Sequence, residues 1–263
     1  MKKYLYIYKA TLIENLNYIP NIILGFINFF VMMFVFLNLW QYIYSDSSQI
    51  INGYTNSQMI WYVLITEVLW FGTRNKILTK EISQDIKSGN IAYNINKPYN
   101  YVFYIIAKHL GEITIKFILF TIVGIIIGMC FVGPIENFNF MNIVFLLITV
   151  LLGILINSIL RIMISIFSFW IEDSTPFHWV YDKLILVLGT LFPIEMFPKV
   201  LQPIMKFTPI YVVTYGPAKL IIDFSMQNFI HILVAQIIYL VITISLIVIL
   251  YKKGVKKLNV NGG

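Results

Sequence analysis

The stretch E-I-S-Q-D-I-K-S-G-N-I-A, at residues 81–92, decides the fold because it is charged and amphipathic and lies between two long apolar runs. Those runs cover about residues 57–73 and 101–132. The whole chain is 59% hydrophobic and 12% charged, whereas soluble domains average about 25% charged residues. An integral membrane protein is indicated. Because the apolar runs do not alternate with period two, they predict helices and not a barrel.

The apolar runs predict an all-α fold with six membrane-spanning helices in one transmembrane domain covering residues 1–263. A crossing needs about 20 apolar residues for roughly 30 Å of hydrocarbon. The second run is short, and the fifth contains Pro193 and ends at Pro198, which interrupt a helix. The predicted spans are residues 20–43, 57–73, 101–132, 141–170, 182–198 and 228–251.

The positions of lysine and arginine predict the orientation, because basic loops stay on the cytoplasmic side. Loops 44–56 and 133–140 contain neither residue type and are expected outside. Both termini are then cytoplasmic, although three lysines in the predicted outer segment 199–227 run against the pattern. The basic segments are residues 2–9, 74–97 and 252–257.

Residues 3–18 predict a helix lying on the inner membrane surface. Leu5, Tyr8, Leu12 and Leu16 recur at helical spacing, as in interfacial helices. The alternative is that this segment begins the first span.

A second amphipathic helix is expected in the loop after the second span. Leu78, Ile82 and Ile86 are four residues apart and form one apolar stripe, with Asp85 exposed beside it. Gly89 is expected to end the helix, because glycine accepts the left-handed conformation found there. Outside the bilayer, such a stripe needs a partner protein or a headgroup layer to cover it.

Several short motifs occur in a fixed order along the chain. The segment I-K-S-G-N-I-A at residues 86–92 is followed by Lys97-Pro98. The C-terminal half contains F-W-I-E-D (169–173), G-T-L-F-P-I-E-M-F-P (189–198), Thr208-Pro209 and Y-G-P (215–217). In these motifs and their order the chain resembles the permease subunits of type-2 ABC exporters, in a bacterial branch with a separate ATPase, where a similar charged segment precedes K-P.

This resemblance implies a six-helix permease with an N-terminal interfacial helix and a cytoplasmic coupling helix near residues 77–89. Short re-entrant helices would precede the sixth span. The residues implied in coupling to the ATPase are Leu78, Ile82, Asp85, Ile86 and Gly89. The prolines of the implied re-entrant element are Pro193, Pro198, Pro209 and Pro217.

The sequence contains no G-x-x-x-x-G-K-[ST] phosphate-binding loop. We therefore expect a separate ABC ATP-binding subunit to bind ATP and Mg, with no cofactor on this chain and no enzyme activity of its own. The resemblance also implies a second permease, identical or homologous, and a bacterial cytoplasmic membrane. The net charge is +7, and the basic residues lie mainly at the predicted membrane edges. This position favours contact with lipid headgroups over binding of nucleic acid. The implied exported substrates are drugs, antimicrobial peptides, lipids or glycans.

Two acidic residues are candidates for the pathway or for polar contacts inside the bundle. Glu67 lies in the middle of the second span, where an ionisable group is costly and often functional. It would contact a cationic substrate group or make a structural hydrogen bond. Glu195 lies in the proline-interrupted segment. The competing function is a proton-coupled secondary transporter that uses Glu67.

The remaining polar residues of the spans favour structural roles. Lys108, Glu112 and Lys116 form a charge ladder on one helix face, and Arg161 is expected to extend to the headgroups. The histidines lack the companions of a metal site. Ser165 and Ser168 lack a G-x-S-x-G context, which disfavours an intramembrane serine protease.

Overall fold

The computed structural model describes residues 2–44, 49–136, 138–171 and 173–261, and parts of the loop 44–56 and of the 169–173 match lie outside them. The described residues contain helices and no strand beyond one isolated bridge between Ile51 and Tyr54. The longer helices are α1 (Lys2–Leu16), α2 (Ile19–Ile43), α3 (Asn56–Thr73), α4 (Lys76–Lys87), α6 (Tyr101–Phe131), α7 (Ile143–Ile166), α8 (Thr175–Ile185) and α11 (Met226–Asn261). The shorter ones are α5 (Ile91–Ile95), η1 (Phe140–Asn142), η2 (Phe167–Phe169), η3 (Leu186–Thr190), η4 (Ile194–Met196), α9 (Gln202–Lys206), η5 (Tyr211–Tyr215) and α10 (Gly216–Ile222).

Four helical segments of the described chain are long and apolar enough to cross a membrane. They are Ile19–Ile43, Tyr101–Phe131, Phe140–Phe169 and Met226–Lys257, and they coincide with the first, third, fourth and sixth predicted spans. An all-helical, multi-pass membrane protein is therefore confirmed. The total of six crossings stays a prediction, because α3 and the segment from α8 onward are not among the four.

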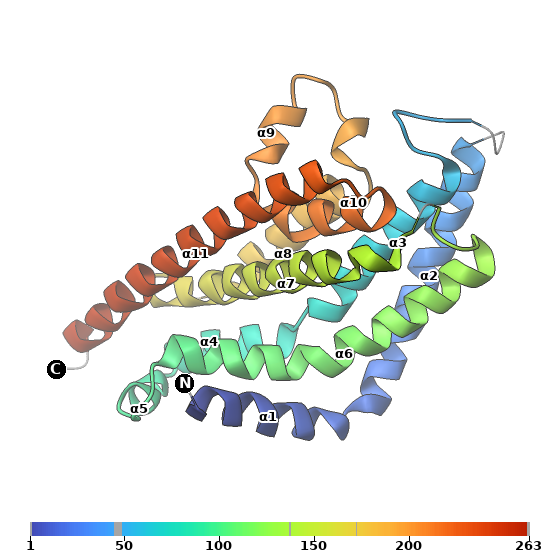
Figure 1. Cartoon of the computed structure of the whole chain (residues 1–263). Coiled ribbons are helices and arrows are strands. Elements are labelled where there is room, and N and C mark those ends of the chain that lie inside the picture. Colours follow the sequence, from blue (N-terminus) through green and yellow to red (C-terminus); the bar gives the residue numbers. More distant parts are fainter. Residues whose placement is uncertain (1, 45–48, 137, 172, 262–263) are drawn as a thin grey trace.

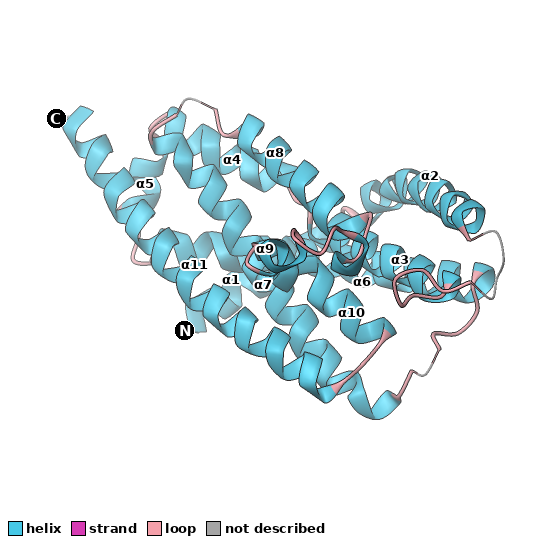
Figure 2. Ribbon diagram, turned by 90° about the horizontal axis from the view of Figure 1, so that it is seen from above, coloured by secondary structure: helices cyan, strands magenta, loops and turns pink. Residues whose placement is uncertain are grey.

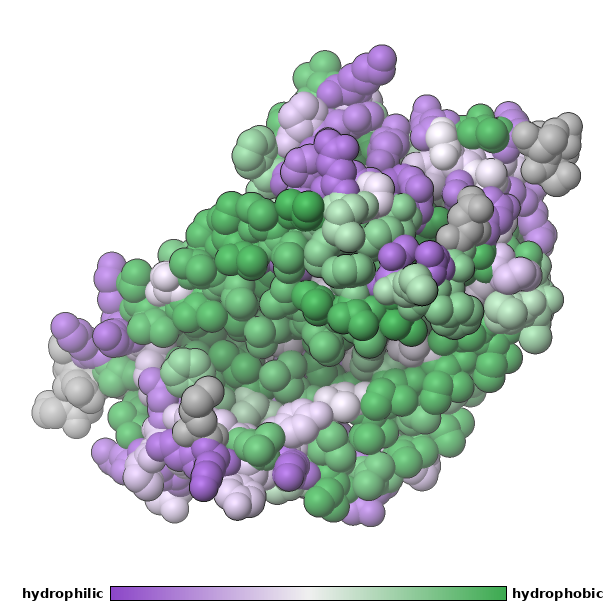
Figure 3. Space-filling model, in the orientation of Figure 1, coloured by the Kyte–Doolittle hydropathy of each residue, from purple (hydrophilic) through white to green (hydrophobic). Residues whose placement is uncertain are grey.

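The long helices form two groups of neighbours, and apolar side chains cover the outer surface of both. α7 packs along α11, and α6 packs along both α1 and α3 (Figure 1). Seen from above, the short helix α9 lies over the middle of the bundle (Figure 2), and Figure 1 shows that it projects beyond the ends of the neighbouring helices. The visible face carries a broad apolar zone between polar residues at its two ends (Figure 3). Such a zone is what a lipid environment requires of the outer surface.

Helix α3 is the most enclosed of the predicted spans. A capping box starts it, in which the Thr55 hydroxyl accepts from the Gln58 amide and the Gln58 side chain accepts from the Thr55 amide. Tyr62, Val63 and Leu64 are essentially inaccessible to solvent. Because α3 is covered by protein on most sides, it needs less apolar character than a helix that faces lipid.

Helix α1 lies against α6 and contacts it through polar and small residues. Gly111 permits the close approach, since a Cβ there would lie 2.7 Å from the Tyr8 carbonyl oxygen. The Tyr8 hydroxyl also lies 3.2 Å from the Thr114 hydroxyl. Leu5 and Leu16, two of the residues that defined the expected apolar stripe, are about half exposed. The position of α1 at a membrane surface stays a prediction.

The fifth predicted span is broken in the structure. Helix α8 ends at Ile185 and passes into the π-helical turn η3, which ends at Thr190 just before Pro193. Four short helical pieces, η4, α9, η5 and α10, then lead to α11. Proline explains the breaks, because it lacks an amide donor and clashes with the preceding turn. Pro193 precedes η4, Pro198 follows it, and Pro217 occupies the first turn of α10.

Candidate functional site

Helix α4 is the charged, amphipathic segment between two long helices. It begins at Asn75, whose side-chain oxygen accepts from the Leu78 amide at 3.1 Å. It ends at Ser88, and Gly89 follows with φ +79°. Only glycine adopts that conformation without strain. The amphipathic helix therefore begins within one residue of its expected start, and the expected glycine follows its C-cap residue.

The apolar stripe of α4 faces the chain's own core. Leu78 and Ile82 are 0% exposed and Ile86 is 4% exposed. The expectation that a partner protein or a headgroup layer covers the stripe is therefore wrong. Residue spacing identifies the apolar face of a helix, but it does not identify what packs on that face. The stripe belongs to one buried hydrophobic cluster with residues of α6, α7, η2 and α11, namely Tyr101, Val102, Ile105, Ile159, Ile162, Ile166, Phe169 and Ile247.

The opposite face of α4 is exposed and basic. Ile77 is 82% exposed, and the exposed residues beside and beyond it are Lys76, Lys80, Gln84 and Lys87. Asp85, expected to be exposed, is half-buried, and its carboxyl group lies 3.5 Å from the Asn94 amide nitrogen. Burial raises the pKa of Asp85, and the nearby Glu81 adds to this effect.

Side-chain contacts fasten α4 to two other helices. Glu81 accepts two hydrogen bonds from the Lys108 ammonium group of α6, at 2.7 and 2.9 Å. The Ser83 hydroxyl lies 2.6 Å from that of Ser174, which immediately precedes α8. These contacts connect α4 to α6 and to the residue that precedes α8.

Two arginines share one buried carboxylate where α3 meets α4. Asp182 of α8 forms ion pairs with Arg74 at 2.7 Å and with Arg161 of α7 at 2.9 Å. Arg161 is 3% exposed, so the expectation that it extends to the headgroups is wrong. The guanidinium of Arg74 also lies 4.4 Å from the ring centroid of Trp70. This cluster joins three helices that are distant in sequence, which is why helical spacing did not predict it.

The charged residues Lys108, Glu112 and Lys116 of α6 make contacts within that helix and also to residues outside it. Lys108 and Glu112 approach to 4.0 Å, as their spacing predicts. Glu112 also accepts a hydrogen bond from the Asn75 side chain. The Lys116 ammonium group donates to the Arg74 carbonyl oxygen at 2.7 Å. The ladder thus connects α6 to the α3–α4 junction.

A serine–histidine contact lies close to the arginine cluster. Ser165 of α7 and the Nε2 atom of His178 in α8 are 2.9 Å apart. Ser165 is fully buried, and among the described residues the Nδ1 atom of His178 has no hydrogen-bond partner. A serine nucleophile needs an oriented base and access to substrate. This arrangement supplies neither and holds α7 against α8.

The two acidic candidates have different surroundings. Glu67 is 1% exposed, and within the described chain neither carboxyl oxygen has a hydrogen-bond partner. Glu195 accepts from the Tyr54 hydroxyl at 2.9 Å and from the Tyr215 hydroxyl at 2.6 Å. Glu195 is therefore held by two tyrosine hydroxyls, whereas Glu67 has no hydrogen bond to any described residue, including Glu195.

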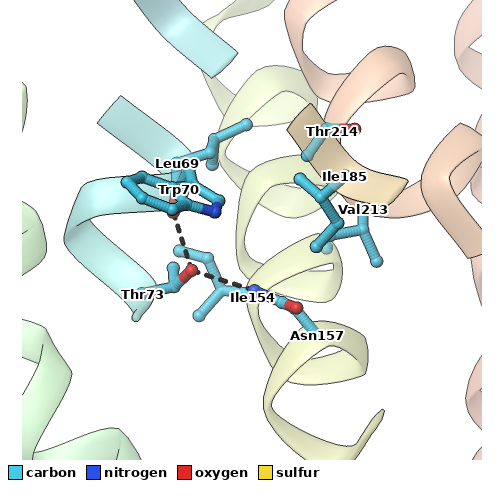
Figure 4. Close-up of a pocket in the computed structure, with 9 residues that line it drawn as sticks. Leu69, Trp70, Thr73, Ile154, Asn157, Ile185, Val213 and Thr214 are labelled. Atoms are coloured by element: carbon cyan, nitrogen blue, oxygen red, sulfur yellow. Dashed lines mark hydrogen bonds between the residues drawn. The ribbon is translucent and has the colours of Figure 1, made fainter. Parts of the chain in front are cut away.

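A small cavity lies between α3, α7, α8 and η5. Its volume is about 10 Å³, which is no more than one water molecule occupies. The Asn157 amide lies across it and donates to the Thr73 hydroxyl at 2.9 Å, while Thr73 donates to the Leu69 carbonyl oxygen at 2.7 Å (Figure 4). The Asn157 carbonyl accepts from Tyr181. This cavity is part of the packing and is too small for a substrate.

The fold and the polar network define a helical, multi-pass membrane protein, without an assembled catalytic centre among the described residues. The family model of the ABC-2 family transporter proteins matches residues 14–262. The chain therefore belongs to the ABC-2 transporter family and is a membrane permease component, as its sequence resemblance predicted. No curated protein matches the chain.

Proposed function

We propose that this chain is the membrane-spanning permease of an ATP-driven exporter, and that the exposed face of α4 contacts a separate ATP-binding subunit. ABC-2 permeases normally pair with such a subunit. In this proposal α4 and both termini are cytoplasmic, ATP and Mg are bound by the partner, and a second permease, identical or homologous, completes the pathway. The α9 side then faces outward, with the proline-interrupted pieces as the re-entrant element.

The observation that carries this proposal is the two-sided character of α4. Its buried side fixes it to the bundle through Leu78, Ile82 and Ile86. Its other side presents Ile77 and Lys80 to the surroundings. A partner with a groove that is apolar at its floor and acidic at its rim would match this surface. Leu78, Ile82 and Ile86 then act in coupling by positioning the helix, and not by contacting the ATPase.

The contacts of α4 supply a route for the movement. Closure of the ATP-binding subunits would push α4, and the Glu81–Lys108 and Ser83–Ser174 contacts would pass the displacement to α6 and α8. Because α8 continues into the π-helical turn η3, a shift of α8 reaches the proline-interrupted segment. π-Helical turns are common at sites where helices change shape.

The test is charge reversal on the exposed face. Lys80→Glu and Lys87→Glu in a C-terminally tagged chain should each reduce, by about tenfold or more, co-purification of a chain carrying a G-x-x-x-x-G-K-[ST] motif from the native membrane. Lys199→Glu, an exposed position before α9, is the matched control. Unchanged co-purification in a Lys80→Glu/Lys87→Glu double variant would contradict the docking proposal.

A second candidate function is proton-coupled transport through Glu67, favoured by a buried carboxyl group without a hydrogen-bond partner among described residues. The two candidates differ in their energy source. In proteoliposomes, Glu67→Gln should abolish transport driven by a pH gradient if the carboxyl group carries the proton. Transport that needs ATP and survives Glu67→Gln would exclude this candidate.

A further inference from the structure

A groove of about 630 Å³ lies between α1, α2, α6 and the α3–α4 junction. Its two ends differ in chemistry. One end is lined by charged residues, among them Arg74, Lys76 and Lys116, and the other by Ile22, Gly25 and Phe120. This groove is far larger than the cavity beside Asn157, and it shares Lys76 and Ile77 with the α4 surface proposed to contact the ATPase. A long ligand with one polar end would match it.

The charged end has more positive than negative charge, since the groove is lined by four basic residues and three acidic ones. Asp182 is shared between Arg74 and Arg161, so the cluster carries two cations and one carboxylate. Lys116 adds a third cation, and its one hydrogen bond to a described residue is to the neutral Arg74 carbonyl oxygen. The Nε atom of Arg74 is buried and lacks a partner in the described chain.

The nearby acidic residues do not correct this imbalance. Glu81 is occupied by Lys108, and Glu112 accepts from Asn75 and lies 4.0 Å from Lys108. Glu14 is exposed on α1 at the opposite wall of the groove. Cations in a partly buried site are costly unless they are paired. A bound anion beside Lys116 and Arg74 would supply the missing partner.

The apolar end is open to the lipid-facing surface. Gly25 has no side chain to fill the slot, and a Cβ built there would lie 3.4 Å from the Phe120 ring. Beyond the slot, Leu24 of α2 is 63% exposed and Ile118 of α6 is 47% exposed. The apolar end of the groove therefore lies near exposed apolar side chains of two membrane-length helices, where lipid hydrocarbon is the expected neighbour.

The depth of the groove suits a membrane headgroup. At 1.5 Å per residue, Lys116 and Lys108 lie about 22 and 35 Å from the Phe131 end of α6. The hydrocarbon layer is about 30 Å thick. With the Phe131 end of α6 at the outer edge of the hydrocarbon, the charged end of the groove would span the level at which hydrocarbon gives way to headgroups on the α4 side.

We propose that this groove binds one phospholipid of the leaflet that adjoins α4. Its phosphate group contacts Lys116 and Arg74, and one acyl chain occupies the slot at Gly25 and Phe120. Charge complementarity and continuity with the lipid-facing surface both favour a phospholipid over a free anion. This site does not depend on the identity of the transported substrate or on the ATPase partner.

The test titrates the purified full chain in mild detergent with dihexanoyl phosphatidylglycerol, using tryptophan fluorescence or thermophoresis. Dihexanoylglycerol, which lacks the phosphate, should bind about tenfold or more weakly, because the charge-assisted contact to the phosphate is lost. Inorganic phosphate at the same concentration should not displace the lipid. Equal binding of dihexanoylglycerol, or displacement by phosphate alone, would overturn the proposal in favour of an apolar slot or a free-anion site.

Variants locate the binding to the two ends of the groove. Lys116→Gln should weaken the phosphatidylglycerol affinity about tenfold, Lys116→Arg should retain it, and Lys253→Gln at the exposed end of α11 is the control. Gly25→Leu narrows the acyl slot and should weaken binding without removing a charge. Gel filtration verifies folding of each variant. Wild-type affinity in both Lys116→Gln and Gly25→Leu would place the lipid elsewhere and refute the assignment.

Discussion

Buried ionisable groups have ionic partners at the α4 end of the bundle, whereas Glu67 in its middle has none among the described residues. At the α4 end, Asp182 lies between Arg74 and Arg161, and every member of the cluster has an ionic partner. Glu67 of α3 is at least as deeply buried but has no partner among the described residues. A buried pair contributes little net stability, yet removing one member is costly because it leaves an unpaired charge. Substitutions at the two places should therefore have very different effects.

The largest effect is expected for Asp182→Ala. Both guanidinium groups lose their partner, and the free energy of unfolding should fall by about 3–5 kcal/mol. The measurement is the thermal unfolding midpoint of purified protein in detergent, with Asp223→Ala, an exposed ion-pair residue of the α9 side, as control.

A double variant separates loss of charge from loss of volume. Asp182→Leu/Arg161→Met removes one charge of each sign but leaves Arg74, whose side chain is 23% exposed, without its carboxylate. It should recover part of the stability lost in Asp182→Ala, because similar apolar volume replaces the more deeply buried pair. A midpoint as low as that of the single variant would assign the loss to Arg74 and not to Arg161.

The next effect is expected for Tyr215→Phe, at the α9 side. This change removes the 2.6 Å hydrogen bond to Glu195 and leaves the bond from Tyr54 in place. A loss of roughly 1–3 kcal/mol is expected, as for one buried hydrogen bond to an acidic group. Tyr211→Phe, which keeps the ring stack on Tyr215 but makes no hydrogen bond to Glu195, is the matched control in the same unfolding assay.

His178 makes the stability depend on pH. Burial, with Arg161 adding to it and Asp182 and Asp173 partly opposing it, lowers the pKa of His178 to about 4. An unfolded histidine has a pKa of about 6.5. Between these values the unfolded state binds the proton and the folded state does not. Stability is therefore unaffected above pH 6.5 and decreases as the pH falls, by about 2 kcal/mol at pH 5.

His178→Gln tests this dependence. The amide keeps a hydrogen-bonding group near Ser165 but does not titrate. The variant should lose part of the decrease in unfolding midpoint between pH 7 and pH 5, whereas His231→Gln at the exposed start of α11 should not. Identical pH profiles for wild type and His178→Gln would contradict a neutral, buried imidazole.

Long apolar runs were predictable from the sequence, and contacts between distant residues were not. The predicted span 101–132 matches Tyr101–Phe131, and 20–43 matches Ile19–Ile43, because the hydrophobic effect acts on every residue of such a run. The stop at Gly89 was also predictable, since its cause is local. These features depend on neighbours within a few residues.

The polar network required the fold. Asp182 lies 21 residues from Arg161 and 108 from Arg74, and helical spacing carries no information about contacts over such separations. The same reason explains the wrong predictions for Arg161 and for the cover of the α4 stripe. The break after Ile185 was suggested by Pro193, but the π-helical turn that precedes the proline had no recognisable pattern.

The smallest effect on stability is expected for Glu67→Gln. No ionic partner of described residues is lost, the volume is conserved, and a neutral amide is less costly to bury than a carboxylate. The unfolding midpoint should change by less than the equivalent of about 1 kcal/mol, in contrast to Asp182→Ala. A loss as large as that of Asp182→Ala would reveal a cationic partner of Glu67, supplied by a second permease or a bound substrate. Retained stability together with altered transport would instead assign Glu67 to the pathway.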